Sequence, residues 1–326
     1  MEKALQLSKN IFVLDGGLGT LLALSGCQID GDPLWSTRAV LNNPEAVIWA
    51  HTQYLEAGAR VIETCTYQAG LAMLQKELNC SKGAAMDTVL RRAVELARKA
   101  VAQFQANHPE CTDQIFVAGS IGPFGATLAD VSEYTGDYLK THDANEIIQY
   151  HSGQATALVE IGVDLLVFET VPSLKEAQYI AEALKHLPNV FTWVSFSCKD
   201  GSATCFGDRF RDCAELVEKS DVFDAIGVNC TMPDNIAPLL KSATSNISAT
   251  KPFVLYPNSG ELYHEDKTWV KSASSATDRS WTDFAMEWAK VPNVRVIGGC
   301  CRVFPEHVRE ISNTVQKLNR ESHSSD

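Results

Sequence analysis

Short apolar runs alternate along the chain with longer segments in which apolar residues recur every three or four positions. The short runs predict β-strands, and the longer segments predict amphipathic helices. Eight strands are expected, at residues 11–14, 60–64, 115–118, 164–168, 191–196, 225–228, 252–256 and 294–297. Helices are expected between and after them, at residues 44–58, 84–104, 146–161, 174–187, 211–219, 235–242, 281–290 and 305–318.

Nearly continuous apolar runs are typical of strands in a parallel sheet that is covered on both faces. Eight such strands with intervening helices predict one α/β domain over residues 1–326, a (β/α)8 TIM-type barrel whose active site lies at the carboxyl ends of its strands. The alternative is an open doubly wound sheet, but the Gly-rich residues 15–19 lack the third glycine of a nucleotide-binding fingerprint.

Three long irregular stretches each follow a predicted strand, where a barrel builds the walls of its active site: residues 27–43, 127–145 and 258–279. At the end of the chain, the polar residues 320–326 are expected to form a frayed tail.

Composition narrows the class of protein. The chain has 326 residues, 45% of them hydrophobic, and a net charge of -12, which argues against nucleic acid or an anionic membrane surface as a partner. No run approaches the roughly 18 apolar residues of a membrane span, and residues 1–10 lack the apolar core of a signal peptide. The ten cysteines are therefore expected to be reduced thiols of a cytoplasmic protein.

The two adjacent thiols of Cys300 and Cys301 are the strongest sign of chemistry. They follow an apolar run and two glycines, whose backbone freedom lets neighbouring thiolates turn toward one cation. Zinc accepts thiolates but takes about four ligands, so further ligands must come from elsewhere. Cys230, which also follows an apolar run, is the best third candidate. The alternative interpretation is that all three are ordinary buried cysteines.

Polar residues gather at the carboxyl ends of the predicted strands, and these ends meet at one mouth in a barrel. The residues concerned are Asp15, Glu63, Glu169, Asn229, Cys230, Asn258, Cys300 and Cys301. Cys230 lies far from Cys300 in sequence, unlike the local ligand pairs of a structural zinc finger.

Three thiolates leave one zinc position open, as in a catalytic site. A centre so rich in thiolate is a poor activator of water, and the eight histidines form no hydrolytic metal motif. Such a centre is well suited to bind a fourth thiol and keep it deprotonated, whereas a free thiol has a pKa of about 8.5. Nucleophilic attack by a substrate sulfur is the expected reaction.

Six segments occur in an order that resembles the homocysteine S-methyltransferases, from about residue 11 to residue 311. They are Asp15-Gly16-Gly17, Gly119-Ser120-Ile121-Gly122-Pro123, Phe168-Glu169-Thr170, Gly227-Val228-Asn229-Cys230, Tyr256-Pro257-Asn258-Ser259-Gly260-Glu261 and Gly298-Gly299-Cys300-Cys301-Arg302. Residues 32–36 and 132–136 are similar to the branch that uses S-methylmethionine or S-adenosylmethionine. The resemblance implies that Cys230, Cys300 and Cys301 bind Zn²⁺ and catalyse methyl transfer, and that the product is methionine.

The resemblance also suggests roles in substrate binding. Glu169 and Asp15 are the candidate partners of the homocysteine ammonium, although Asp15 can also be read as a turn or helix-cap residue. The backbone of Gly16 and Gly17 is a candidate partner for the substrate carboxylate. Asn229 is a further substrate-binding candidate, with bracing of a loop as the alternative.

Tyr67 and Tyr134 present rings that either face a cationic donor or pack in the core. The resemblance implies small-molecule partners, which are homocysteine and a sulfonium donor. The protein is expected to be a monomer. Two alternatives remain. One is a betaine-dependent homocysteine methyltransferase, whose members typically carry a C-terminal extension that this chain does not show. The other is a non-catalytic zinc or thiol redox sensor built on a barrel.

Overall fold

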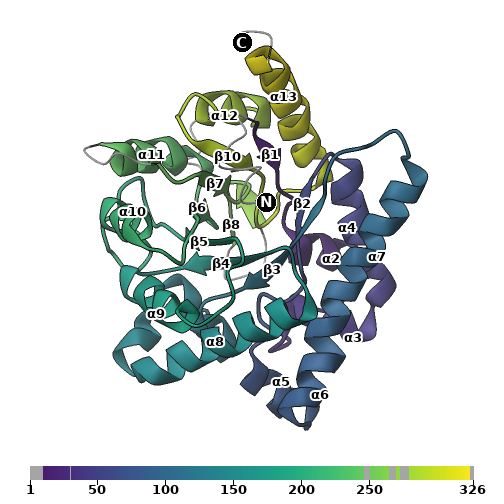
Figure 1. Cartoon of the computed structure of the whole chain (residues 1–326), viewed down its shortest axis with the longest axis vertical. Helices are drawn as coiled ribbons and strands as arrows, with labels where there is room; N and C mark the ends of the chain where they lie inside the picture. Colours follow the sequence, from purple (N-terminus) through teal and green to yellow (C-terminus); the bar gives the residue numbers. More distant parts are fainter. Residues whose placement is uncertain (1–9, 30, 246–249, 264–268, 272–278, 324–326) are drawn as a thin grey trace.

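Eight parallel strands form a closed ring surrounded by helices in the computed structural model, which describes residues 10–29, 31–245, 250–263, 269–271 and 279–323 (Figure 1). The strands are hydrogen-bonded in the order β1-β10-β7-β6-β5-β4-β3-β2. A parallel bridge between Leu14 and Val61 joins β1 to β2 and closes the ring. The predicted (β/α)8 barrel is confirmed.

The barrel strands lie close to the predicted positions. They are β1 (Phe12–Val13), β2 (Val61–Glu63), β3 (Phe116–Ile121), β4 (Leu165–Val171), β5 (Thr192–Phe196), β6 (Ala225–Asn229), β7 (Phe253–Tyr256) and β10 (Val294–Ile297). Their principal helices are α4 (Pro44–Glu56), α7 (Arg92–Asn107), α8 (Ala144–Ile161), α9 (Leu174–Leu184), α10 (Phe210–Lys219), α11 (Ile236–Thr244), α12 (Trp281–Trp288) and α13 (Pro305–His323).

Alternation along the strands creates two hydrophobic layers, because successive strand residues point to opposite faces. Val61 and Val254 belong to a cluster built almost entirely from strand residues, which fills the interior of the barrel. Their neighbours Ile62 and Leu255 belong to the larger cluster between the strands and the helices. The interior layer also contains a hydrogen bond from the Trp193 ring N–H to the Tyr256 hydroxyl, at 3.3 Å.

Two strands continue beyond their predicted ends. We expected β3 and β4 to end at Ala118 and Phe168, because the apolar runs stop there. Instead the two strands pair as far as Ile121 with Phe168, and β4 runs on to Val171. Pairing between neighbouring strands therefore outweighs the local strand preference of these residues. As a result, Glu169 lies within the sheet.

Several helical segments were not predicted. They are α2 (Leu18–Leu24), α3 (Arg38–Asn42), α5 (Leu71–Leu78), and short 3-10 turns that include Trp35–Thr37 and Ser132–Tyr134. The predicted helix 84–104 is divided into α6 (Lys82–Ala85), a π-helical turn (Met86–Arg91) and α7. The last helix extends to His323, so residues 320–323 of the predicted frayed tail are helical, and 324–326 lie outside the described residues.

The predicted irregular stretches contain structure of their own, and the first two contribute residues to the pocket at the carboxyl ends of the strands. Residues 27–43 contain a 3-10 turn and α3, and residues 127–145 contain short 3-10 turns. In the third stretch, β8 (Glu261–Tyr263) pairs antiparallel with β9 (Trp269–Lys271), while residues 264–268 and 272–278 lie outside the described part of the chain.

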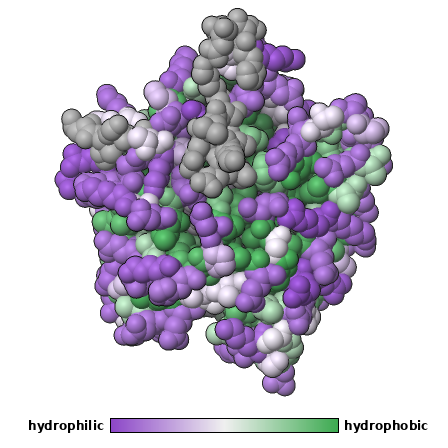
Figure 2. Space-filling model, viewed as in Figure 1, coloured by the Kyte–Doolittle hydropathy of each residue, from purple (hydrophilic) through white to green (hydrophobic). Residues whose placement is uncertain are grey.

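The surface follows the same layering. On the face viewed in Figure 2, hydrophilic side chains cover most of the periphery, and hydrophobic residues are concentrated nearer the centre. Among the described helices, none is long and apolar enough to cross a membrane.

Glu176 anchors the wall that contains residues 124–140. This fully buried carboxylate, in the first turn of α9, accepts hydrogen bonds from the Phe124 N–H at 2.7 Å and from the Tyr138 hydroxyl. It also lies 3.0 Å from Nε2 of the buried His151. One side chain thus ties the wall to two helices behind it.

Replacing Glu176 by alanine should lower the free energy of unfolding by about 3 kcal/mol or more, because three buried polar groups lose their acceptor. The change is measured by chemical denaturation. The control is Glu182→Ala on the same helix, where an exposed pair with Lys185 is lost and a change within about 0.5 kcal/mol is expected. Equal stability of the two variants would contradict the anchoring role.

Candidate functional site

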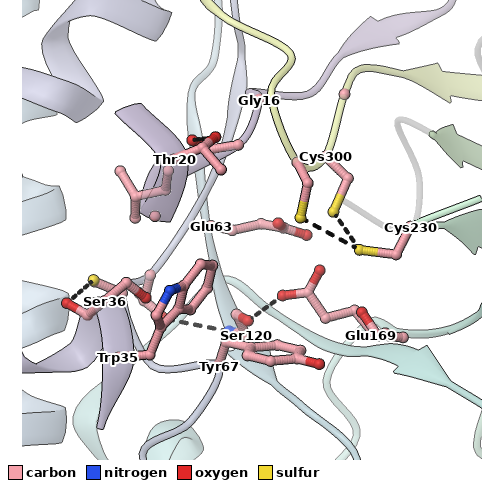
Figure 3. Close-up of a pocket in the computed structure, with 18 of the residues that line it drawn as sticks. Gly16, Thr20, Trp35, Ser36, Glu63, Tyr67, Ser120, Glu169, Cys230 and Cys300 are labelled. Carbon is pink, nitrogen blue, oxygen red and sulfur yellow. Dashed lines mark hydrogen bonds between the residues drawn. The ribbon is translucent and has the colours of Figure 1, made fainter. Parts of the chain in front are cut away.

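A pocket opens at the carboxyl ends of the barrel strands and draws its lining from most of the ring (Figure 3). The lining residues that bear on its chemistry are Gly16, Gly17, Thr20, Trp35, Glu63, Tyr67, Ser120, Tyr134, Glu169, Cys230, Gly299, Cys300 and Cys301. This is the location that the strand-end pattern of polar residues predicted.

Three sulfurs meet at one side of the pocket. The Cys230 Sγ atom lies 2.9 Å from that of Cys300 and 3.8 Å from that of Cys301. The three sulfurs are all within 4.8 Å of one another, and no other group of this kind is found among the described residues. Figure 3 shows the Cys230 and Cys300 thiols pointing toward each other from two different loops. The sequence therefore located three side chains that the fold brings together.

The backbone is bent at both ends of this cluster. Cys230 has a φ of 45°, in the left-handed region that non-glycine residues seldom occupy and that is often found at functional sites. On the other loop, the Cys300 N–H donates to the Pro257 carbonyl at 2.8 Å, and the Cys301 carbonyl accepts from Ser259. A Cβ atom on Gly299 would lie 2.1 Å from the Val303 side chain, so only glycine fits there.

The donor set suits a soft divalent cation. Tetrahedral coordination with zinc–sulfur bonds of about 2.3 Å places sulfurs about 3.8 Å apart. The separation of Cys230 and Cys301 already has this value. Cys300 lies closer to Cys230, at 2.9 Å, so a metal would spread this pair by about 0.9 Å, which a small side-chain rotation can supply.

Glu169 lies beside the sulfurs, near the carboxyl end of β4 (Figure 3). Its carboxylate accepts a hydrogen bond from the Ser120 hydroxyl and a longer one from Asn229 Nδ2, at 3.5 Å. Burial raises the pKa of Glu169 to about 7, and the Ser120 hydrogen bond acts in the opposite direction. A cationic ligand in the pocket would favour the ionised carboxylate.

Asp15 lies behind the pocket and is not among the residues that line it. It is buried, and its Oδ2 atom accepts the Glu63 N–H at 2.9 Å. Burial is the main reason that the pKa of Asp15 is raised well above its usual value. The carboxylate that enters the pocket beside Glu169 is that of Glu63, whose pKa is raised by burial and by repulsion from Glu169 and Asp15.

The other predicted substrate-binding residues are Asn229, Gly16 and Gly17, and the structure shows that they already make contacts within the protein. Asn229 is fully buried, and its amide pairs with the Thr170 N–H and hydroxyl at 2.8 Å, which is the bracing alternative. Gly16 and Gly17 line the pocket, but the Gly17 N–H already donates to the Val303 carbonyl at 3.0 Å. A Cβ on either glycine would clash with the loop of residues 300–303.

An aromatic wall stands across the pocket from the cysteines. Trp35 and Tyr67 pack edge to face with centroids 6.3 Å apart, and Figure 3 shows both rings opposite the thiols. Tyr134, which is 42% exposed, completes this wall at the surface. Tyr67 and Tyr134 therefore line the site, while Trp35 was missed as a site residue because it lies outside the strand ends.

Glu63 was also missed as a site residue, although it was noted at a strand end. Strand periodicity could have identified it, because Glu63 follows Val61 by two positions and Val61 points into the barrel. Asp15 instead follows the interior residue Leu14 by one position. A residue an even number of positions from an interior strand residue is therefore expected to enter the mouth of the barrel. A residue an odd number of positions away is expected to lie behind it.

Comparisons with known proteins agree with this geometry. A family profile described as homocysteine S-methyltransferase matches residues 12–315. Homocysteine S-methyltransferase 3 of Zea mays is 37% identical over 314 residues, which cover 94% of this chain and 90% of the maize protein. Homocysteine S-methyltransferase YbgG of Bacillus subtilis is 36% identical over 319 residues, with coverage of 94% and 95%.

A solved structure agrees as well. The metallated form of the homocysteine methyltransferase MmuM from Escherichia coli superposes with a TM-score of 0.81 at 32% identity, covering 95% of this chain and 98% of that one. The chain belongs to the homocysteine S-methyltransferase family.

Proposed function

We propose that this protein transfers a methyl group from a sulfonium donor, S-methylmethionine or S-adenosylmethionine, to the thiol of L-homocysteine, giving methionine. The main support for the proposal is that three thiols, two carboxylates and an aromatic wall line the same pocket. Family membership and the homocysteine named in the relatives' descriptions support the choice of acceptor.

Cys230, Cys300 and Cys301 are the proposed ligands of Zn²⁺. When bound by three thiolates, Zn²⁺ would hold a fourth thiol in its deprotonated, nucleophilic form near neutral pH. The description of the Escherichia coli relative as a metallated form is consistent with a metal in this cluster.

The chain's own residues orient the two substrates. Glu169 is the proposed partner of the acceptor's ammonium, and hydrogen bonds from Asn229 to Glu169 and Thr170 support its position. Asp15 supports the opposite wall through the Glu63 backbone. Gly16 and Gly17 form the floor beside the cysteine loop and allow its close approach. We also propose that the protein acts as a single-domain monomer.

The aromatic wall is the proposed site of the donor. The faces of Trp35, Tyr67 and Tyr134 carry negative electrostatic potential that attracts a sulfonium cation. In the reaction, a donor methyl–sulfur bond breaks while a bond forms between that carbon and the acceptor sulfur. The donor leaves as a neutral thioether, so its positive charge disappears during the step. A pocket without a lining lysine, arginine or histidine among the described residues suits such a donor.

The test is an assay of the zinc-loaded protein with homocysteine and each donor separately. Methionine should form with S-methylmethionine or S-adenosylmethionine and should not form with betaine. Turnover with betaine alone would favour the betaine-dependent alternative. No methionine from any of the three donors, with zinc bound, would contradict the proposal and favour a non-catalytic thiol site.

A further inference from the structure

Glu63 is a carboxylate inside the pocket that holds the three cysteines. It ends strand β2 and lines the pocket together with Glu169. Figure 3 shows its side chain reaching toward the space between Cys300 and Glu169. Its strand parity gives the same direction, because Val61, two positions earlier, is part of the barrel interior.

One oxygen of the Glu63 carboxylate lacks a hydrogen-bond partner among the described residues. This oxygen is Oε1, and it is buried. No lysine, arginine or histidine is found among the described lining residues. A buried carboxylate oxygen without a partner is unfavourable, so the arrangement calls for a donor that arrives with a ligand.

A metal at the cysteines does not supply that partner. Among the described residues, the metal-ligating group that forms within 4.8 Å contains the three sulfurs and no carboxylate oxygen. Glu63 therefore faces the ligand rather than the cation. In homocysteine, four bonds separate the sulfur from the amino nitrogen, so a thiol at the cysteines leaves the ammonium near the two glutamates.

From this geometry we infer that Glu63 and Glu169 together clamp the α-ammonium of the acceptor, and that Glu63 makes the site selective for amino-acid thiols over plain thiol acids. The inference rests on the proposed function. Asp15 is a positioning residue in this arrangement, because its carboxylate accepts the backbone N–H of Glu63.

The test compares Glu63→Gln with the wild type by isothermal titration calorimetry of the zinc-loaded proteins. Two ligands are used: homocysteine and 4-mercaptobutanoate, which has the same chain without the amino group. The Kd for homocysteine should rise about 10- to 100-fold in the variant, since a charged hydrogen bond is lost. The Kd for 4-mercaptobutanoate should change by less than about threefold or should fall, because no ammonium is present.

The exposed Glu160→Gln substitution on α8 serves as a control and should leave both constants unchanged. Glu63→Asp keeps the charge but shortens the side chain, and it should restore part of the preference for homocysteine. Equal losses for both ligands, or no loss for homocysteine, would overturn the inference. These outcomes differ from failure of the proposed function, in which the wild type itself would form no methionine.

Discussion

Cys230→Ser should abolish stoichiometric zinc binding and reduce methyl transfer to homocysteine by at least about a thousandfold. The serine hydroxyl stays protonated near neutral pH and cannot replace a thiolate, so only the adjacent pair on the other loop would remain. In the structure, the Cys230 sulfur lies 2.9 Å from that of Cys300 and 3.8 Å from that of Cys301. Metal content by atomic emission and initial rates of methionine formation measure the two effects.

Cys80→Ser is the matched control for this substitution. Cys80 is a half-buried thiol between α5 and α6 and does not line the pocket. This variant should bind one zinc ion and retain the wild-type rate. If Cys230→Ser keeps both its zinc and its activity, the three-sulfur centre is not the reaction site.

Glu169→Gln should lower kcat/KM for homocysteine by about a hundredfold while leaving zinc content unchanged. The substitution preserves size but removes the charge that faces the acceptor's ammonium. The Ser120 hydroxyl and Asn229 amide donate to this carboxylate, and an amide can accept at only one of the two positions. Steady-state kinetics at saturating donor separate this effect from a change in donor binding.

A purely structural role for Glu169 would give a different result. In that case the variant would unfold more readily, and its rates with homocysteine and with 4-mercaptobutanoate would fall by the same factor. The proposed role predicts a loss confined to the amino-acid thiol. Glu160→Gln, an exposed substitution on α8, provides the baseline for both measurements.

The fold was predictable because one signal determined most of it. Continuous apolar runs separated by helical segments indicate eight parallel strands, and burial on both faces leaves few ways to arrange them. Strand ends were less predictable, as β3 and β4 show, because pairing such as that of Ile121 with Phe168 depends on a distant neighbour. Short helices such as α2 and α5 lie in the connections, where local sequence gives weak signals.

Site residues were predictable where a thiol or carboxylate side chain lies near the carboxyl end of a strand. Cys230 and Cys300 follow strands β6 and β10, Glu169 lies near the carboxyl end of β4, and all three enter one pocket. Asp15 was chosen as a substrate-binding candidate and Glu63 was not, because position at a strand end does not reveal which face a side chain takes. The aromatic wall was only partly predicted, because the position of Trp35 depends on the path of a long connection.

X-ray absorption at the zinc edge tests the central claim most directly. The zinc-loaded protein is measured with and without homocysteine, so that the ligands of the metal are counted in both states. We expect three sulfurs and one lighter atom without the acceptor, and four sulfurs at about 2.3 Å with it. Fewer than three sulfurs at the start, or no additional sulfur when homocysteine is bound, would contradict the account.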